Sequence, residues 1–524
     1  MGDERDLKQT GWTRRDALRR SAVFALSASA GFPPFAPALA ADGKVLTVGS
    51  AFSPLSMDPS LSGNGRAGVH LMPAYEPLVR TKADGSFEPA LATAWRMSDD
   101  SKEATFTLRQ DARFSDGDVV NAEAVKASVQ YFVGKKGPFS VNFATLAEIE
   151  VIDPFKITFK MSQPQPNLIS LFDAYFLGAD IISPKALATP DLLGSQTFGA
   201  GPYKLDPSAT ITGKSYSYLP NEFYYDKSRV VWDKIVITVF EDQNSGIQSL
   251  KSGQLKLLVS DPLTANSNAA NLGSDLRIIS DPVSWTGLII VDRDGIVQSQ
   301  LKDARVRQAI NYALDRKLIC KALFGKFAEP TDQLQGRGFM GYDEANEERY
   351  PYDPAKARAL LAEAGLPDGF ELNVGYVNNT LSTFLTQAVA GQLKKVGILV
   401  KSVEYQNFGA MNNAARQHGF ATLIFNSNSS VPNLAKFQTL DAHGSLNFYN
   451  TEDPTLTKSI AEASLLPIDK AEAAWKKVYA QVVELAWFAP VGAIHVCYFA
   501  SNSIKAPEPG QSLVIDLINV VPAT

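Results

Sequence analysis

The chain has 524 residues, 45% of them hydrophobic, so it can bury large cores and is expected to form roughly two to four domains. Its 50 basic and 55 acidic residues give a net charge of −5, with no excess of one sign. This balance argues against a nucleic-acid partner and against a protein that binds membrane surfaces.

The first 40 residues carry the pattern of an export signal. Paired arginines in residues 13–20 (TRRDALRR) precede a weakly apolar run that contains Pro33 and Pro34, and small residues follow up to Ala40. The order is typical of a twin-arginine signal peptide, whereas a membrane span would need a longer run with fewer small and helix-breaking residues. Cleavage after Ala40 predicts a soluble periplasmic protein, and the lack of a nearby cysteine predicts that it carries no lipid anchor.

Several segments predict strands because apolar and polar residues alternate along them. In chain order they are KVLTVGS near residue 44, TFTLRQ near 105, KITFKMS near 156, KIVITVF near 234 and ELNVGYV near 371. The apolar run from Leu485, LAWFAPVGAIHVCYFA, contains Pro490 and His495 and is too short for a membrane span, so a core strand is predicted there.

Three segments predict helices with one core-facing side. Asn121 can cap the segment NAEAVKASVQYF, and DPAKARALLAEAG has a capping Asp353 and a closing Gly365. Between them, DARVRQAINYALDRKLI predicts one helix that begins at Asp303. Its apolar positions are Val306, Ala309, Ile310, Ala313, Leu314 and Leu318. Strands and helices alternate without repeats, which indicates an α/β or α+β architecture.

Catalytic and metal-binding patterns are missing from the sequence. The four histidines are isolated, and neither an HxxxH nor a CxxC spacing occurs, so no metal or other cofactor is expected. His495 and Cys497 share a strand face, yet two ligands do not make a site. The segment GNGRAG (residues 63–68) follows a turn and not a strand, which argues against a dinucleotide site. No nucleophile motif supports an enzyme, although carboxylates that meet in space stay an open alternative.

The two cysteines leave two states open. Cys320 and Cys497 could form one long-range disulfide in an oxidising compartment, or both could be buried free thiols. Buried free thiols are the favoured alternative.

Ordered sequence blocks resemble one protein family along nearly the whole mature chain. They are PLSMDPS, AYEPLVR, residues 86–129 from SFEPALATAW onward, GAGPYKL at Gly199, LKDARVRQAINYALDR at Leu301 and YPYDPAKARALLAEAGLPDGFEL at Tyr350. In this order they resemble the family 5 solute-binding proteins of ABC importers, which bind dipeptides, oligopeptides, nickel chelates or opines. The resemblance implies a receptor without catalysis, with an α/β fold similar to type II periplasmic binding proteins: two lobes, a hinge and an extra subdomain.

The resemblance also implies a domain layout and partners. The expected segments are a signal peptide at 1–40, lobe I at 41–85, 180–282 and 490–524, the extra subdomain at 86–179, and lobe II at 283–489. A small ligand closes the lobes around itself, and the closed form docks on ABC permease subunits that work with an ATPase. The receptor itself is expected to be a monomer.

A neutral polar segment, FNSNSSVPN at residues 425–433, departs from the peptide-binding relatives. In those relatives the corresponding loop supplies an aspartate that pairs with the α-ammonium group of the ligand, and here no acid is present. Since a buried ammonium group without a counter-charge costs several kcal/mol, the loop favours a neutral or carboxylate-bearing ligand that is not a peptide. The alternatives are an oligopeptide receptor, and a periplasmic receptor or chaperone that contacts a partner protein without transport.

By the same resemblance, several other segments are expected to meet this loop in the cleft. Arg66 could clamp a carboxylate, and Trp285 offers a flat apolar face, although a solvated loop and core packing are the respective structural alternatives. The candidate ligand-binding residues are Asn64, Arg66, Phe139, Ser260, Trp285, Asn407, Asn426, Asn428 and Ser430.

Overall fold

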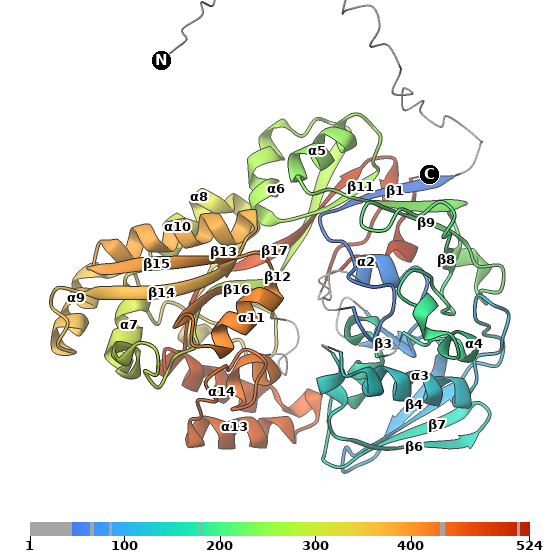
Figure 1. Ribbon diagram of the computed structural model, residues 1–524, viewed down its shortest axis with the longest axis horizontal. Coiled ribbons are helices and arrows are strands. Elements are labelled where there is room, and N and C mark those ends of the chain that lie inside the picture. Colours follow the sequence, from blue (N-terminus) through green and yellow to red (C-terminus); the bar gives the residue numbers. More distant parts are fainter. Residues whose placement is uncertain are drawn as a thin grey trace, which may run out of the picture. The chain divides into compact units, whose positions relative to one another are not determined.

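The computed structural model describes residues 44–523 apart from 63–67, 83–85, 138, 179, 430–434 and 511–513. Its main feature is an eleven-stranded mixed sheet that joins segments far apart in the sequence (Figure 1). Across the sheet the strands are β15 (Ile398–Tyr405), β14 (Phe370–Val377), β16 (Thr422–Asn428), β12 (Leu276–Ile290), β17 (Phe488–Ser501), β11 (Leu257–Ser260), β1 (Val45–Ser50), β10 (Lys234–Val239), β9 (Ser215–Pro220) and β8 (Tyr203–Leu205), with β13 (Ala328–Pro330) paired to β17.

Two long antiparallel strands, β12 and β17, form the middle of this sheet. Their pairing is interrupted by a bulge between Pro282 and Ser284. Side chains on the two sides of the bulge enter different hydrophobic clusters. Val496 belongs to a first core that also contains β1 and β10, whereas Leu288 and Ile494 belong to a second core. The apolar run predicted as a core strand is β17, and it passes from one core to the other.

Helices cover both faces of the parallel strands β14, β15 and β16. α10 (Thr380–Lys394) packs on one face in the second core, and α11 (Phe408–Arg416) packs on the other in a third core (Figure 1). Leu423 and Ile424 of β16 lie in the third and the second core respectively. Their alternation follows from the strand itself, because successive side chains point to opposite faces.

The helix predicted to begin at Asp303 is divided in two, α7 (Ala304–Tyr312) and α8 (Arg316–Leu323). Asp315 is the reason for the break, since its carboxylate accepts the backbone N–H of Leu318 at 2.9 Å and caps a new helix. Leu318 is 50% exposed, so its predicted place in the core was wrong.

The other two predicted helices begin at their predicted caps. Asn121 accepts a backbone N–H and starts α3 (Ala122–Lys135), and Asp353 does the same for α9 (Pro354–Glu363). Gly365 follows α9 with a φ of +80°, the left-handed conformation that glycine adopts without strain.

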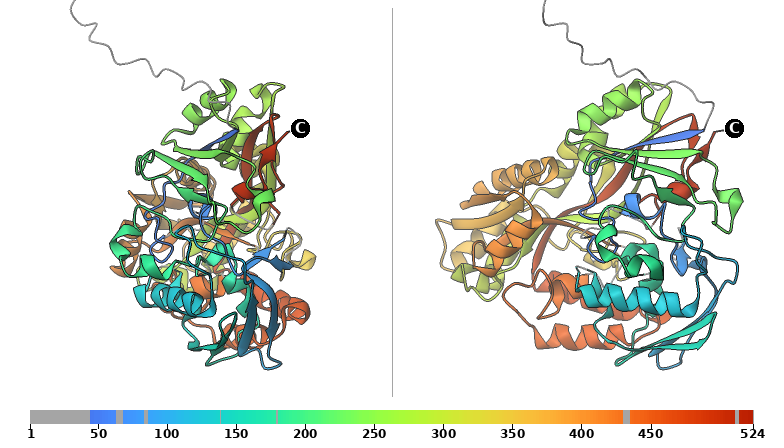
Figure 2. Two further views of the ribbon diagram at one scale, coloured as in Figure 1. Left: turned by 90° about the vertical axis from the view of Figure 1, so that its right-hand side faces the viewer. Right: turned by 45° about the vertical axis from the view of Figure 1, so that its right-hand side comes forward.

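A separate antiparallel sheet of four strands lies beneath α3 (Figure 2). Its strands in spatial order are β4 (Ala92–Met97), β5 (Glu103–Leu108), β7 (Lys156–Met161) and β6 (Leu146–Asp153). Phe106, Phe159 and Phe172 contact one another, with ring centroids 4.2 to 5.9 Å apart. With β5 and β7, all five strands predicted from alternation are confirmed.

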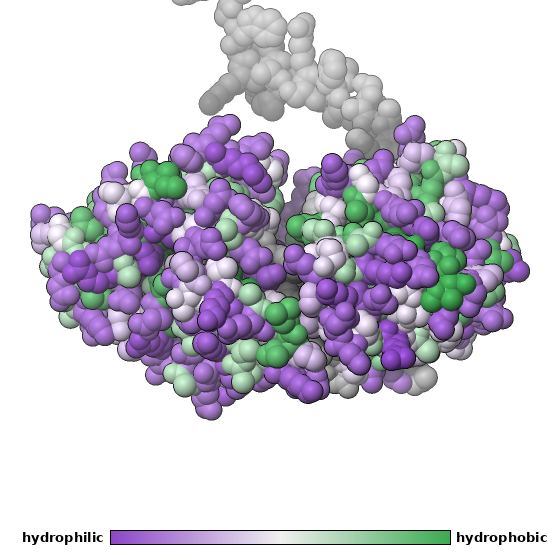
Figure 3. Space-filling model, turned by 90° about the horizontal axis from the view of Figure 1, so that it is seen from below, coloured by the Kyte–Doolittle hydropathy of each residue, from purple (hydrophilic) through white to green (hydrophobic). Residues whose placement is uncertain are grey.

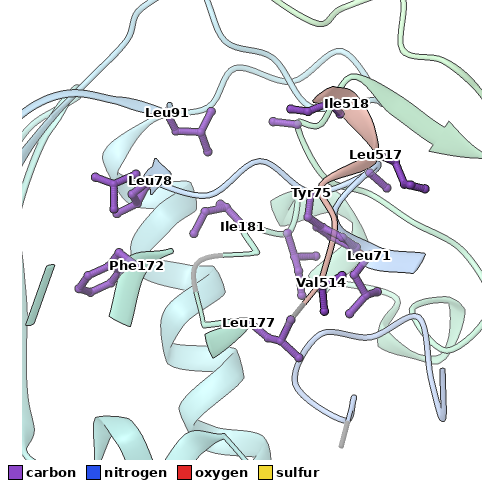
Figure 4. Close-up of a cluster of buried hydrophobic side chains, with 14 of the residues drawn as sticks. Leu71, Tyr75, Leu78, Leu91, Phe172, Leu177, Ile181, Val514, Leu517 and Ile518 are labelled. Atoms are coloured by element: carbon purple, nitrogen blue, oxygen red, sulfur yellow. The ribbon is translucent and has the colours of Figure 1, made fainter. Parts of the chain in front are cut away.

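The first core gathers the N-terminal and C-terminal parts of the described chain (Figure 4). The buried side chains labelled there come from α2 (Gly68–Leu71), from residues 75–91 and 172–181, and from residues 514–518. The remaining helices and strands are β2 (Val79–Thr81), β3 (Phe87–Pro89), α4 (Pro184–Leu187), α5 (Gln243–Lys251), α6 (Pro262–Asn268), α13 (Pro454–Ser464), α14 (Glu472–Glu484), β18 (Ile504–Lys505) and β19 (Val521–Pro522).

Both cysteines are buried thiols that are not joined in a disulfide, the alternative favoured from the sequence. Burial raises the pKa of the Cys320 thiol to about 12, so this thiol stays protonated and unreactive at neutral pH. In the part of the chain that the structure describes, no helix is both long and apolar enough to span a bilayer.

Acid is expected to destabilise the first core through His70, which is fully buried and donates a hydrogen bond from Nε2 to the carbonyl oxygen of Phe52 at 2.8 Å. Burial lowers its pKa from 6.5 to about 4. Between these values the unfolded chain binds a proton that the folded chain does not, so about 3 kcal/mol of stability is lost as the pH falls from 6.5 to 4.

The His70→Gln variant keeps a donor but does not titrate, and should show a flatter fall of stability over this pH range in urea unfolding. The exposed His443→Gln variant is the control and should keep the wild-type slope. Equal slopes for wild type and His70→Gln would contradict the assignment.

Candidate ligand-binding site

The carboxyl ends of β14, β15 and β16 meet at one edge of the main sheet, because these strands are parallel. Amide side chains lie at or just beyond each end. They are Asn378 and Asn379 after β14, Gln406 and Asn407 after β15, and Asn426 and Asn428 in the last part of β16. Ligand sites of open α/β sheets lie outside the carboxyl ends of the strands, so this edge is the candidate site.

Trp285 lies directly beside the neutral polar segment. In the antiparallel pairing of β12 with β16, Trp285 is opposite Ser427, and Ser284 is opposite Asn428. The indole is 3% exposed, and its ring centroid is 5.6 Å from that of Phe488. The structure therefore brings together two predicted regions that are more than a hundred residues apart, and Trp285 mainly packs in the third core.

Serine hydroxyls near this edge fix the local backbone. Ser427 Oγ donates to Gln438 Oε1 at 2.9 Å, and Ser429 Oγ donates to the Leu334 carbonyl oxygen at 2.9 Å. These two hydroxyls are therefore already engaged within the protein. Asn426 is half-buried, and its side chain makes no hydrogen bond to any described residue.

Asn407 and Ser260 have structural partners of their own. The Asn407 side chain caps α11 by accepting the backbone N–H of Ala410 at 2.9 Å, and the residue is exposed. Ser260 is at the carboxyl end of β11, 4% exposed, and donates to Gln243 Oε1 at 3.1 Å. Since β11 is parallel to β1 and separated from β12 by β17, Ser260 belongs to the carboxyl edge of the first core's strands.

Phe139 lies in the segment between α3 and β6. It follows α3, its ring centroid is 6.4 Å from that of Tyr175, and it packs against the first core. The ring is partly buried, and a ligand contact of Phe139 stays a prediction. Three other candidates, Asn64, Arg66 and Ser430, lie outside the described residues.

Charged groups near the sheet edges are already used by the fold. Asp242 and Asp261 follow β10 and β11, and their carboxylates cap α5 and α6. His495 of β17 interacts through Nδ1 with the Ser280 hydroxyl at 3.1 Å, and burial lowers its pKa, opposed by Asp281. Among the described residues no cluster of His, Cys, Asp and Glu could hold a metal ion.

A hollow is visible between two masses of the protein in the space-filling view (Figure 3). Its rims are mainly hydrophilic, with a few apolar residues. Neutral amide groups like those at the carboxyl ends of β14, β15 and β16 can hydrogen-bond a small polar molecule.

Two neighbouring asparagines, Asn378 and Asn379, were missed in the sequence. The available signal was the pair of asparagines directly after the strand ELNVGYV. Using it requires the strand order, because only the pairing of β14 with β15 and β16 places that strand end beside the other two.

Comparisons with known proteins agree on one family. The sequence pattern described as "Bacterial extracellular solute-binding proteins, family 5 Middle" matches residues 86–446. A glutathione-binding protein of Salmonella typhi is 29% identical over 367 residues, which cover 69% of each chain.

Solved structures share the fold. A binding protein of Agrobacterium tumefaciens R10 in complex with agropinic acid superposes with a TM-score of 0.78 at 22% identity, covering 92% of this chain and 99% of that one. A periplasmic binding protein of Helicobacter pylori in complex with the peptide STSA gives a TM-score of 0.79 at 21% identity, covering 92% and 98%. At these identities the likeness concerns the fold alone.

Proposed function

The chain belongs to the bacterial extracellular solute-binding proteins of family 5, and from this premise we propose that it captures a small polar, non-peptide ligand for an ABC importer. Proteins of this family bind solutes without catalysis and deliver them to ABC permeases. The observation that carries the ligand proposal is the group of neutral amide side chains at the carboxyl ends of β14, β15 and β16, which includes Asn426 and Asn428.

Ligand capture by closure needs two bodies that can move about a short connection. β12 and β17 provide such a connection, since both pass from the first core to the second near the bulge at Pro282. A ligand that contacts both bodies shifts the population toward the closed form by the difference between its affinities for the two forms.

The lobe boundaries stay part of the proposal. The bulge between Pro282 and Ser284 supports a first crossing near 282/283. Val491 and Ile494 pack in the second core, which supports moving the second crossing from 489/490 to about 494/495.

The chemistry of the site favours neutral hydrogen-bonding groups or a carboxylate on the ligand. Each neutral amide or hydroxyl contact contributes about 1 kcal/mol, whereas a buried ammonium group left unpaired costs several kcal/mol. An oligopeptide receptor is the second candidate, because one solved structure of this fold binds the peptide STSA.

Native mass spectrometry of the protein purified gently from the periplasm tests the proposal, together with thermal-shift titration. The panel contains agropinic acid, glutathione, the peptide STSA and neutral sugars. A non-peptide that co-purifies and raises the melting temperature with concentration is expected, because binding to the folded state alone stabilises it. A co-purified peptide, with stabilisation by STSA, would favour the oligopeptide receptor instead.

A further inference from the structure

A short π-helical turn, Lys436–Leu440, is joined to the last residues of β16 by one side-chain contact. The hydroxyl of Ser427, between Asn426 and Asn428, donates to the Gln438 side chain at 2.9 Å. The position of this turn therefore bears directly on the position of the two candidate asparagines.

A buried arginine also holds the turn in place, independently of the contact with Ser427. Arg293 follows β12 and is 3% exposed. Its Nη1 donates to the Thr439 carbonyl oxygen at 3.0 Å, and its Nε donates to the Ile290 carbonyl oxygen at 2.8 Å. The guanidinium carbon is 4.1 Å from the centroid of the Trp487 ring. One side chain thus connects the end of β12 to the π-helical turn.

Burying the charged guanidinium group of Arg293 costs free energy of desolvation. It forms no ion pair with any described residue, and burial, together with repulsion from Arg307, lowers its pKa to about 9. The guanidinium is still charged at neutral pH. Its stacking on Trp487 offsets part of the desolvation free energy. Methionine could pack on the same indole without that cost, but it has no donor for the Thr439 carbonyl group.

We propose that Arg293 is a positioning residue for the ligand site: it fixes the π-helical turn at Thr439, and the turn, through Gln438 and Ser427, fixes Asn426 and Asn428. Its effect on ligand affinity rests on the proposed function. Its effect on the turn does not.

Hydrogen–deuterium exchange of the ligand-free protein tests the first step. The amides of Asp441 and Leu446 donate to the carbonyl oxygens of Lys436 and Gln438, so they report on the turn. In Arg293→Met their exchange should become about tenfold faster through local opening.

Arg316→Met is the matched control. Arg316 is also a buried arginine, and it donates to the carbonyl oxygens of Pro490, Asn311 and Tyr350 and makes no contact with the turn. This variant should lose global stability without a selective effect on the two reporter amides. If exchange at these amides is the same in Arg293→Met and Arg316→Met, the positioning role is overturned.

If the Arg293→Met variant does not fold, the Arg293→Lys variant serves for the same test. Lysine retains the charge but cannot donate to two carbonyl groups in one fixed geometry, so the reporter amides should exchange about threefold faster. Wild-type exchange in this variant would also overturn the proposal.

Affinity tests the second step, with agropinic acid and glutathione as the probes. For a probe that stabilises the wild type, Arg293→Met should weaken binding about tenfold and Arg316→Met by less than about twofold. If neither probe binds the wild type, that failure concerns the proposed ligand class, while the exchange result still decides the positioning role. Equal affinities for a bound probe would limit Arg293 to fold stability and refute its role at the site.

Discussion

Replacing Arg80 by methionine is expected to lower the free energy of unfolding by about 3 to 5 kcal/mol, because it leaves a buried carboxylate without its cation. Glu76 is fully buried, and the Arg80 Nη2 atom is 2.5 Å from its Oε2 atom. Tyr225 donates to Glu76 Oε1 at 2.6 Å. Burial raises the pKa of Glu76, and the charge of Arg80 opposes this, so in the variant Glu76 must take up a proton or remain as an uncompensated charge.

The surroundings of the pair make compensation difficult. Asp516 Oδ2 lies 3.9 Å from Arg80 Nε, so removing the arginine also takes a cation away from a second, half-buried carboxylate. Burial raises the pKa of Asp516 as well. The loss of one arginine therefore affects two acids that lie far apart in the sequence, next to the first core.

Urea unfolding followed by circular dichroism and tryptophan fluorescence measures this loss. Combining Glu76→Gln with Arg80→Met should cost less than the sum of the two single variants, with a coupling of about 1 to 3 kcal/mol. Lys317→Met is the control, since the Lys317 and Glu348 side chains of that ion pair are 76% and 65% exposed, and it should unfold like the wild type. An Arg80→Met variant as stable as this control would refute the role of the buried pair.

Local features of the sequence predicted most of the secondary structure. Asn121, Asp303 and Asp353 cap helices because the capping side chain and the N–H group that it accepts are three residues apart or fewer. The single error in this class, the helix that is divided at Asp315, has the same physical origin. The helical spacing of apolar residues continues from α7 into α8, so the sequence predicted one helix and Asp315 was not recognised as the cap of a second.

The candidate site depends on contacts that local patterns do not contain. Trp285 lies beside Ser427 only because β12 inserts between β16 and β17. The resemblance to the family suggested both regions, but not their register. Likewise the ring of Phe139 contacts Tyr175, and no local pattern in the sequence specifies that contact. Arg293 was missed because its partner, the Thr439 carbonyl group, is a backbone atom with no sequence signature.

Replacing Asn428 by aspartate is expected to change the ligand preference of the protein. Asn428 is 6% exposed and lies opposite Ser284 in the pairing of β16 with β12. A carboxylate at this position would be buried, and a ligand without a cation could not compensate its charge. Affinity for a neutral or carboxylate-bearing ligand should fall about 100-fold, equivalent to about 2.7 kcal/mol. A ligand with a free ammonium group, such as the peptide STSA, should gain affinity.

Isothermal titration of the Asn428→Asp variant over a range of pH separates the effect of charge from that of shape. Burial should raise the pKa of the introduced carboxyl group, and its protonated form is close to the native amide in size. Lowering the pH should therefore restore affinity for the native ligand and remove the gain for STSA. The control, Asn413→Asp on the exposed side of α11, adds the same charge in solvent and should leave both affinities nearly unchanged. If Asn428→Asp keeps the wild-type preference at neutral pH, Asn428 does not select the ligand, and the absence of an acid at the end of β16 has no bearing on specificity.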